Sequence, residues 1–234
     1  VNENSVQMSN FSSWGPSDDG RIKPEVVSKG VGVFSSIANS NSSYDTYQGT
    51  SMASPAVSGA CLLLQQHYNN VNSSYMRSST LKGLLMHTAQ EAGFYDGPDY
   101  KFGWGLVDVS KAASVISQKS LGTSIIDELV LNNNSTYTRT FLVANPSDLK
   151  VSICWTDPAS NSFNTSTVDP NVSYLVNDLD LKLTKNNVDY FPWSLNKNYP
   201  NYDDAPTNIG TNNVDIFERV DVDNAVGTYT LTVS

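Results

Sequence analysis

The sequence is poor in histidine, cysteine and basic residues. It holds 2 histidines and 2 cysteines among 234 residues, and 14 Lys and Arg stand against 23 Asp and Glu, for a net charge of −9. This acidity argues against nucleic acid or an anionic membrane surface as a partner, because both require clustered Lys and Arg. Cys61 and Cys154 provide neither zinc-ligand spacing nor a disulfide framework, and we predict two buried free thiols.

Long apolar runs and a leader sequence are also absent. No apolar run reaches the roughly 18 residues that a membrane span needs, so we predict no membrane-spanning segment. The chain opens with VNENSVQMSN, which is not the pattern of a signal peptide. With 39% hydrophobic and 16% charged residues, a folded globular protein of one large or two ordinary domains is expected.

The pattern of apolar residues changes near residue 120. Before it, the periodicity predicts helices over 51–68, from Ser79 or Thr80 to about 89, and over 109–117. The first of these consists of small and apolar residues and is expected to be buried on nearly all sides. Residues 35–47 are polar, lack periodicity and are predicted to form a loop.

After residue 120 the helical period disappears. Six segments alternate apolar and polar residues, as half-buried strands do: 135–144, 148–157, 178–186, 188–195, 212–221 and 227–234. About 110 residues of this kind indicate an antiparallel β-sandwich or jelly roll. We therefore predict two domains, an α/β unit over 1–120 and an all-β unit over 121–234.

The stretch YQGTSMASPAVSG, residues 47–59, places Ser51 among small residues at a predicted helix start. A serine hydroxyl attacks a carbonyl only when a base takes its proton and donors stabilise the oxyanion. The free N–H groups and positive dipole end of a helix N-terminus meet the second requirement. An arbitrary Gly-Thr-Ser is more often a plain helix N-cap, so the argument depends on the longer motif.

The heptapeptide GTSMASP (49–55) resembles the nucleophile signature of the subtilisin-like serine proteases, the subtilase family or peptidase S8. Two further stretches are similar to that family, FSSWGPSDDGRIKPEVV (11–27) and FGWGLVDVSKA (102–112), whereas SKG (28–30) replaces its usual Ala-Pro-Gly. The resemblance implies part of a parallel-sheet α/β catalytic domain. It also implies that Gly49, Thr50 and Ser51 form the nucleophile loop, with protein or peptide as substrate.

Neither histidine suits the role of base. His67 follows Ser51 by 16 residues on the same predicted helix, which places it about 24 Å away, and His87 belongs to the next helix. In the subtilisin order the aspartate and histidine precede the serine, yet no histidine precedes Ser51 here. The resemblance therefore implies a C-terminal portion, inactive alone, whose partner is the missing N-terminal part of the catalytic domain.

The C-terminal half resembles the jelly-roll domain of several secreted subtilases at VSYLVNDLDLKLT (172–184) and GTYTLTV (227–233), which implies a secreted or extracytoplasmic protein. Asp178 and Asp180 alternate with leucines, so both should face one side of a strand. With Asn177 or Asp157 they could hold a structural Ca²⁺, while catalysis would need no cofactor. The alternative is a solvated strand face, or pairing with Lys or Arg.

Two functions follow from these observations. The first is a serine endopeptidase of the subtilisin type that forms an acyl-enzyme on Ser51. The second is a non-catalytic binding or scaffold protein that retains a degenerate protease fold. The intact motif at 49–55 favours the first.

Overall fold

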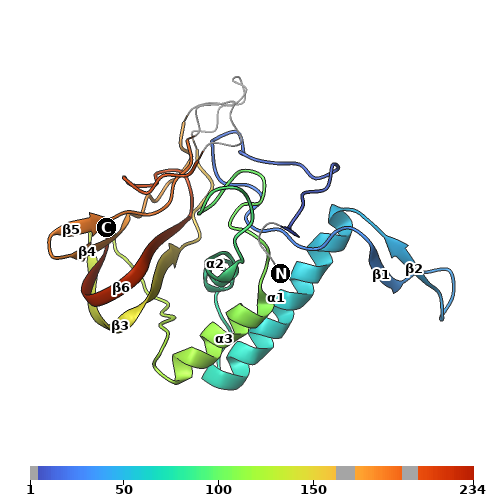
Figure 1. Ribbon diagram of the computed structural model, residues 1–234, viewed down its shortest axis with the longest axis horizontal. Helices are drawn as coiled ribbons and strands as arrows, with labels where there is room; N and C mark the ends of the chain where they lie inside the picture. The colour runs from blue at the N-terminus through green and yellow to red at the C-terminus, as the bar shows by residue number, and fades with distance from the viewer. Residues whose placement is uncertain (1–4, 162–171, 197–204) are drawn as a thin grey trace.

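The computed structural model describes residues 5–161, 172–196 and 205–234. Helices occupy the first half of the chain and long strands the second (Figure 1). Their bounds are β1 Val33–Ser36, β2 Tyr44–Tyr47, α1 Thr50–Asn72, α2 Ser78–Thr88, α3 Val109–Ser120, β3 Tyr137–Cys154, β4 Leu181–Lys185, β5 Val188–Tyr190 and β6 Phe217–Val233. None of the helices in these ranges is long and apolar enough to cross a membrane.

The three predicted helices are confirmed, and α1 is longer than expected. It ends where Ser73 adopts the left-handed conformation and donates its N–H to the Asn69 carbonyl. Its buried stripe packs beside α3 (Figure 1), around a core that includes Leu64, Tyr68 and Ile116.

The prediction that α1 is buried on nearly all sides is wrong for this structure. Leu62 is 74% and Leu63 63% exposed, on the side away from Leu64. A helix that is apolar all round needs partners on every side, and α3 covers one side only.

An acidic residue from a distant part of the chain caps helix α2. The N-cap residue Arg77 makes no side-chain cap hydrogen bond. Instead, Glu128 Oε1 accepts from the Arg77 N–H at 2.7 Å and from the Thr80 hydroxyl at 2.6 Å. A carboxylate in this position satisfies a free N–H and favours the helix dipole. The predicted local cap at Ser79 or Thr80 is therefore replaced by Glu128.

The prediction of a polar loop over 35–47 is wrong at both ends of this range, because strands β1 and β2 form an antiparallel hairpin there. The hairpin extends away from the rest of the molecule (Figure 1). The rings of Phe34 and Tyr44 stack across it with centroids 5.5 Å apart. Cross-strand aromatic pairs stabilise hairpins, although no alternation marked these short strands in the sequence.

The second sheet has four antiparallel strands in the order β3-β6-β4-β5. Strand β3 joins two predicted strands, and β6 extends across another two. The ladder between β3 and β6 continues past Asn145-Pro146 because the register shifts around Ser147, which lies opposite Ala225. Turn-forming residues at such a bulge bend a strand without ending it. Asn186 and Asn187, both with positive φ, turn β4 into β5.

The sheets within the described ranges are both antiparallel, and the single parallel pairing there is an isolated bridge between Val27 and Leu106. The predicted parallel sheet and the predicted jelly roll therefore stay predictions. Helix α2 lies between the α1–α3 pair and the four-stranded sheet (Figure 1).

Close packing joins the two halves of the chain. A Cβ on Gly83 of α2 would lie 2.8 Å from Cys154 Cβ of β3. Next to this contact, Trp104 and Phe217 meet edge to face with ring centroids 4.9 Å apart. Both cysteines are free, as predicted, and each is half-buried rather than fully buried.

Candidate active site

Ser51 lies exposed in the first turn of α1. Gly49 is the N-cap residue, and the residues of the first turn, all of them described, include no acid. No carboxylate of the first turn itself therefore competes for its free N–H groups and the positive end of the helix dipole. The position is suited to an anion that develops next to Ser51.

Gly30 fixes the chain that leads into this turn. The Gly49 N–H donates to the Gly30 carbonyl at 2.8 Å. A Cβ on Gly30 would lie 2.8 Å from the Gly49 carbonyl oxygen, closer than any real side chain comes. The close approach explains why glycine is retained at position 30 even though the two residues before it differ from the subtilase pattern.

The chain's two histidines form hydrogen bonds with serines other than Ser51. His67 Nε2 lies 2.9 Å from the Ser117 hydroxyl, and His87 Nδ1 lies 2.9 Å from the Ser152 hydroxyl. Their partners belong to α3 and β3, so both rings bridge elements of the fold. Neither histidine is therefore paired with Ser51.

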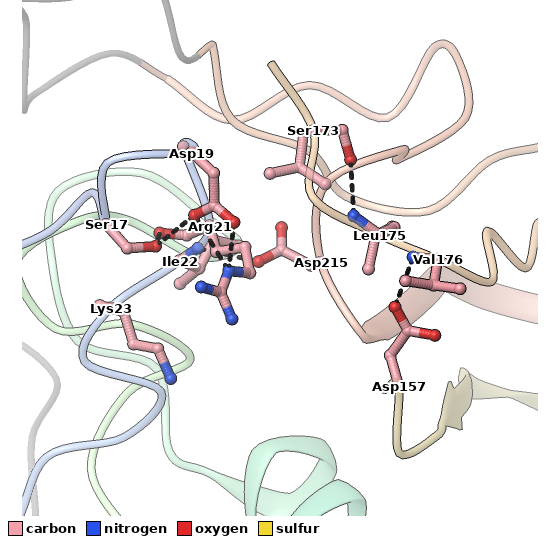
Figure 2. A network of polar contacts seen from close by, with 12 residues as sticks. Ser17, Asp19, Arg21, Ile22, Lys23, Asp157, Ser173, Leu175, Val176 and Asp215 are labelled. Carbon is pink, nitrogen blue, oxygen red and sulfur yellow. Dashed lines mark hydrogen bonds and ion pairs between the residues drawn. The ribbon is translucent and has the colours of Figure 1, made fainter. Parts of the chain in front are cut away.

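The candidate calcium ligands gather near the start of β4, but not on one strand as predicted. Asp157 turns the chain there, because its carboxylate accepts the N–H of Val176 at 2.6 Å (Figure 2) and the N–H of Asn177 at 2.9 Å. Asp178 directly follows the resulting bend, and only Asp180 continues the ladder, with its N–H donating to the Ser234 carbonyl at 2.9 Å.

The electrostatics of this region are those of crowded carboxyl groups. Burial and the charges of Asp180 and Asp157 raise the pKa of Asp178. Burial, assisted by Asp180 and Asp178, raises the pKa of Glu218 to about 9. Glu218 Oε1 is buried and has no hydrogen-bond partner among the described residues. Within those same residues no three His, Cys, Asp or Glu side chains form a metal-binding group.

Sequence reasoning missed a set of buried polar residues between α2 and the four-stranded sheet. Asp215 accepts the Ile22 N–H at 2.8 Å and so joins the loop before β6 to the loop near residue 20 (Figure 2). Arg219 of β6 is 1% exposed and reaches α2. The only signal in the sequence was that Glu218 and Arg219 are adjacent, which interrupts the alternation of apolar and polar residues in the segment 212–221.

Acidification is expected to destabilise the protein through His87. Burial lowers the pKa of His87 from 6.5 to about 4, and nearby cations act in the same direction. The unfolded chain then binds a proton that the folded chain does not, so the free energy of unfolding falls as the pH drops from 6.5 to 4, by about 3 kcal/mol. Urea denaturation at each pH should show that the free energy of unfolding of wild type falls by this amount relative to His87→Gln, and does not change relative to His67→Gln.

Buried acids oppose this effect in the same pH range. Burial raises the pKa of Glu91 to about 7 and that of Asp215 to about 6. In this pH range the folded state binds more protons at these groups than the unfolded state does. These acids destabilise the fold at neutral pH, and their contribution to the free energy of unfolding rises as the pH falls. The informative quantity is the difference between wild type and His87→Gln. A difference that stays constant from pH 7 to pH 4 would contradict the prediction.

Comparison of the sequence with known proteins indicates a protein family. Residues 1–105 match the subtilase family, Peptidase_S8, as the motifs predicted. The C5a peptidase of Streptococcus pyogenes is 34% identical over 153 residues, which are 61% of this chain and 13% of that protein. Pyrolysin of Pyrococcus furiosus is 37% identical over 116 residues, 47% of this chain and 8% of that protein.

A third relative is similar over a larger share of the chain. The serine protease/ABC transporter B family protein tagA of Dictyostelium discoideum is 27% identical over 204 residues, 74% of this chain and 11% of that protein. The chain thus spans about a tenth of the length of each of these relatives. Two of the three relatives are peptidases or proteases by name.

Proposed function

We propose that this chain is the nucleophile-bearing part of a serine endopeptidase of the subtilase family. The observation that carries the proposal is the motif Gly49-Thr-Ser-Met-Ala-Ser-Pro55 at the N-terminus of α1, inside the segment that matches the family. Peptide and protein substrates follow from the class of reaction.

The chemistry is acyl transfer. Ser51 Oγ attacks the scissile carbonyl carbon while its proton passes to a histidine base, and the Ser51 N–H donates to the oxyanion. The C–N bond then breaks, the amine leaves with a proton, and water hydrolyses the resulting ester. In this proposal the histidine and aspartate come from an upstream segment of the catalytic domain, because His67 and His87 are bonded to other serines.

The exposed side of α1 supports a partner of this kind. Leu62 and Leu63 expose more than half of their surface there, and large exposed apolar patches mark interaction sites. We infer that the upstream segment covers this side of α1 and contributes the remaining strands of a parallel sheet. The chain alone would then be inactive.

The remaining part of the proposal concerns residues 121–234. We infer that they form a β-sandwich or jelly-roll domain beside a catalytic portion at 1–120, in a protein that acts outside the cytoplasm. The four-stranded antiparallel sheet and the resemblance to secreted subtilases support this division.

A fluorophosphonate tests the nucleophile. Ser51 Oγ would attack phosphorus with loss of fluoride, and peptide mass mapping of the labelled full-length protein should find the adduct on Ser51. The Ser51→Ala variant should take up no label. A folded full-length protein that remains unlabelled would favour the non-catalytic binding or scaffold function instead.

We also propose a structural Ca²⁺ bound by Asp178 and Asp180, with Asp157 or Asn177 completing the ligand set. Support comes from the chemistry of the donors, since hard cations take carboxylate and amide oxygens, and from the unpartnered Glu218 Oε1 next to them. Bound Ca²⁺ would offset the burial and the repulsion from Asp180 and Asp157 that together raise the pKa of Asp178.

Removal of calcium should lower the melting temperature. A ligand present at 100 times its Kd stabilises a protein by about 2.7 kcal/mol, which corresponds to roughly 5–10 °C for a chain of this size. Calorimetry with and without EGTA should show that drop in wild type. The Asp178→Asn/Asp180→Asn variant should melt at the same temperature under both conditions, and an EGTA-insensitive wild type would contradict the site.

A further inference from the structure

Arg219 links the four-stranded sheet to the segment that matches the subtilase family. Its guanidinium accounts for three hydrogen bonds: Nε and Nη2 donate to Asp221 Oδ2 at 3.1 and 2.8 Å, and Nη1 donates to the Met86 carbonyl at 3.4 Å. The guanidinium carbon also lies 4.6 Å from the ring centroid of Trp104. Asp221 therefore orients a planar cation that touches α2 and Trp104 together.

Trp104 in turn belongs to a tight turn that is bonded to the loop before β1. The Trp104 N–H donates to the Glu25 carbonyl at 2.9 Å, and the Gly105 carbonyl accepts the Val27 N–H at 2.9 Å. Trp104 is 2% exposed, so its ring has little room to move without moving this backbone. A shift of Trp104 is thus transmitted to residues 25–27.

Residues 25–27 lead directly to the nucleophile turn. Gly30 follows Val27 by three residues, and its carbonyl accepts the N–H of Gly49, two residues before Ser51. Gly30 lies so close to the Gly49 carbonyl that there is no free space between the two backbone segments. A continuous series of contacts therefore runs from β6 through Trp104, Val27 and Gly30 to Ser51.

We propose that Arg219 is a positioning residue for Ser51, so that the four-stranded sheet forms part of the scaffold of the active site. The inference rests on the proposed function of Ser51. Arg219 touches neither substrate nor reacting atoms; it acts by holding Trp104 and the last turn of α2. A displacement of the nucleophile by a fraction of an ångström lowers the rate of attack without changing how substrate binds.

Lysine is not equivalent to arginine here. A lysine ammonium lacks the planar face that covers Trp104 and cannot donate to Asp221 and Met86 in the same fixed directions. Arg219→Lys keeps the charge that Asp221 requires, so it removes the geometry while retaining the ion pair. Arg139 of β3 offers a matched control, because it is also an arginine in this sheet but pairs with the exposed Asp127.

The test compares phosphonylation of the full-length wild type, Arg219→Lys and Arg139→Lys by a fluorophosphonate. We expect the rate constant of labelling and the kcat for a peptide substrate to fall about tenfold in Arg219→Lys. The final labelled fraction and KM should stay within twofold of wild type, and Arg139→Lys should match wild type throughout. A purely structural role would instead lower the labelled fraction and leave the rate constant unchanged, which would overturn the inference.

A second variant covers the case in which Arg219→Lys does not fold. Trp104→Phe keeps an aromatic ring but loses the indole face under the guanidinium, and the same tenfold fall in rate is expected. If wild type is labelled and the folded variants react at the wild-type rate, the positioning role is refuted while the proposed protease function stands. Unlabelled wild type refutes the proposed protease function.

Discussion

Replacement of Ser51 by alanine is expected to lower the kcat of peptide hydrolysis by the full-length protein by about 10⁶-fold, with KM nearly unchanged. Removal of the triad serine from a subtilisin has an effect of this size, because histidine and aspartate cannot act without the nucleophile they activate. The remaining rate would come from the oxyanion donors and substrate binding.

A steady-state assay on a peptide substrate measures the effect, and Ser58→Ala is the matched control. Ser58 is also exposed on α1, but its hydroxyl donates to the Ser54 carbonyl at 3.1 Å, further along the helix than the nucleophile loop. Its removal should change kcat less than twofold. If Ser51→Ala kept more than a hundredth of wild-type kcat, another residue would have to be the nucleophile.

Gly105→Ala is expected to destabilise the protein by about 4 kcal/mol. Gly105 has φ 112°, where side chains are strongly disfavoured, and an added Cβ would lie 2.0 Å from the Gln90 carbonyl oxygen. That carbonyl already accepts the Leu106 N–H at 2.8 Å. The backbone at residue 105 would therefore have to move away from the backbone at Gln90. Strain and lost hydrogen bonds together place such a change among the severe ones.

The matched control for this substitution is Gly122→Ala, measured by urea denaturation in parallel. Gly122 also has positive φ, at 71°, but a Cβ added there would meet no atom within 4 Å beyond its own chain neighbours. The Gly122→Ala variant should therefore lose only the free energy that a side chain costs in the left-handed conformation, about 1 kcal/mol. Equal losses in the two variants would show that the close approach to Gln90 is not what requires glycine at 105.

The sequence predicted the helices and the strand-rich half well because periodicity reports burial directly. It failed where contacts distant in the sequence decide the outcome. Asn145-Pro146 was a plausible strand end, yet pairing of β3 with β6 on both sides carried the strand past it through a bulge. The hairpin at β1 and β2 was missed since its exposed residues show no alternation.

The candidate site divides in the same way. Ser51 could be singled out as a candidate because a local motif and a predicted helix start coincide within a few residues, and the helix does start there. Asp178 and Asp180 were assigned to one strand on alternation alone, whereas Asp157, about twenty residues earlier, bends the chain just before them. Arg219 was not singled out at all, because an arginine in an alternating strand normally faces solvent and only its partners on α2 reveal a buried role.

The carboxylate of Glu128 has a consequence for any attempt to divide this chain. A polypeptide that ended at residue 120 would contain the whole of α2 but not the group that accepts from Arg77 and Thr80 at its first turn. During synthesis, likewise, the first turn of α2 leaves the ribosome some fifty residues before its cap does. The change of composition near residue 120 therefore marks where the helical pattern ends, while the first unit that can fold with the start of α2 satisfied extends at least to residue 128.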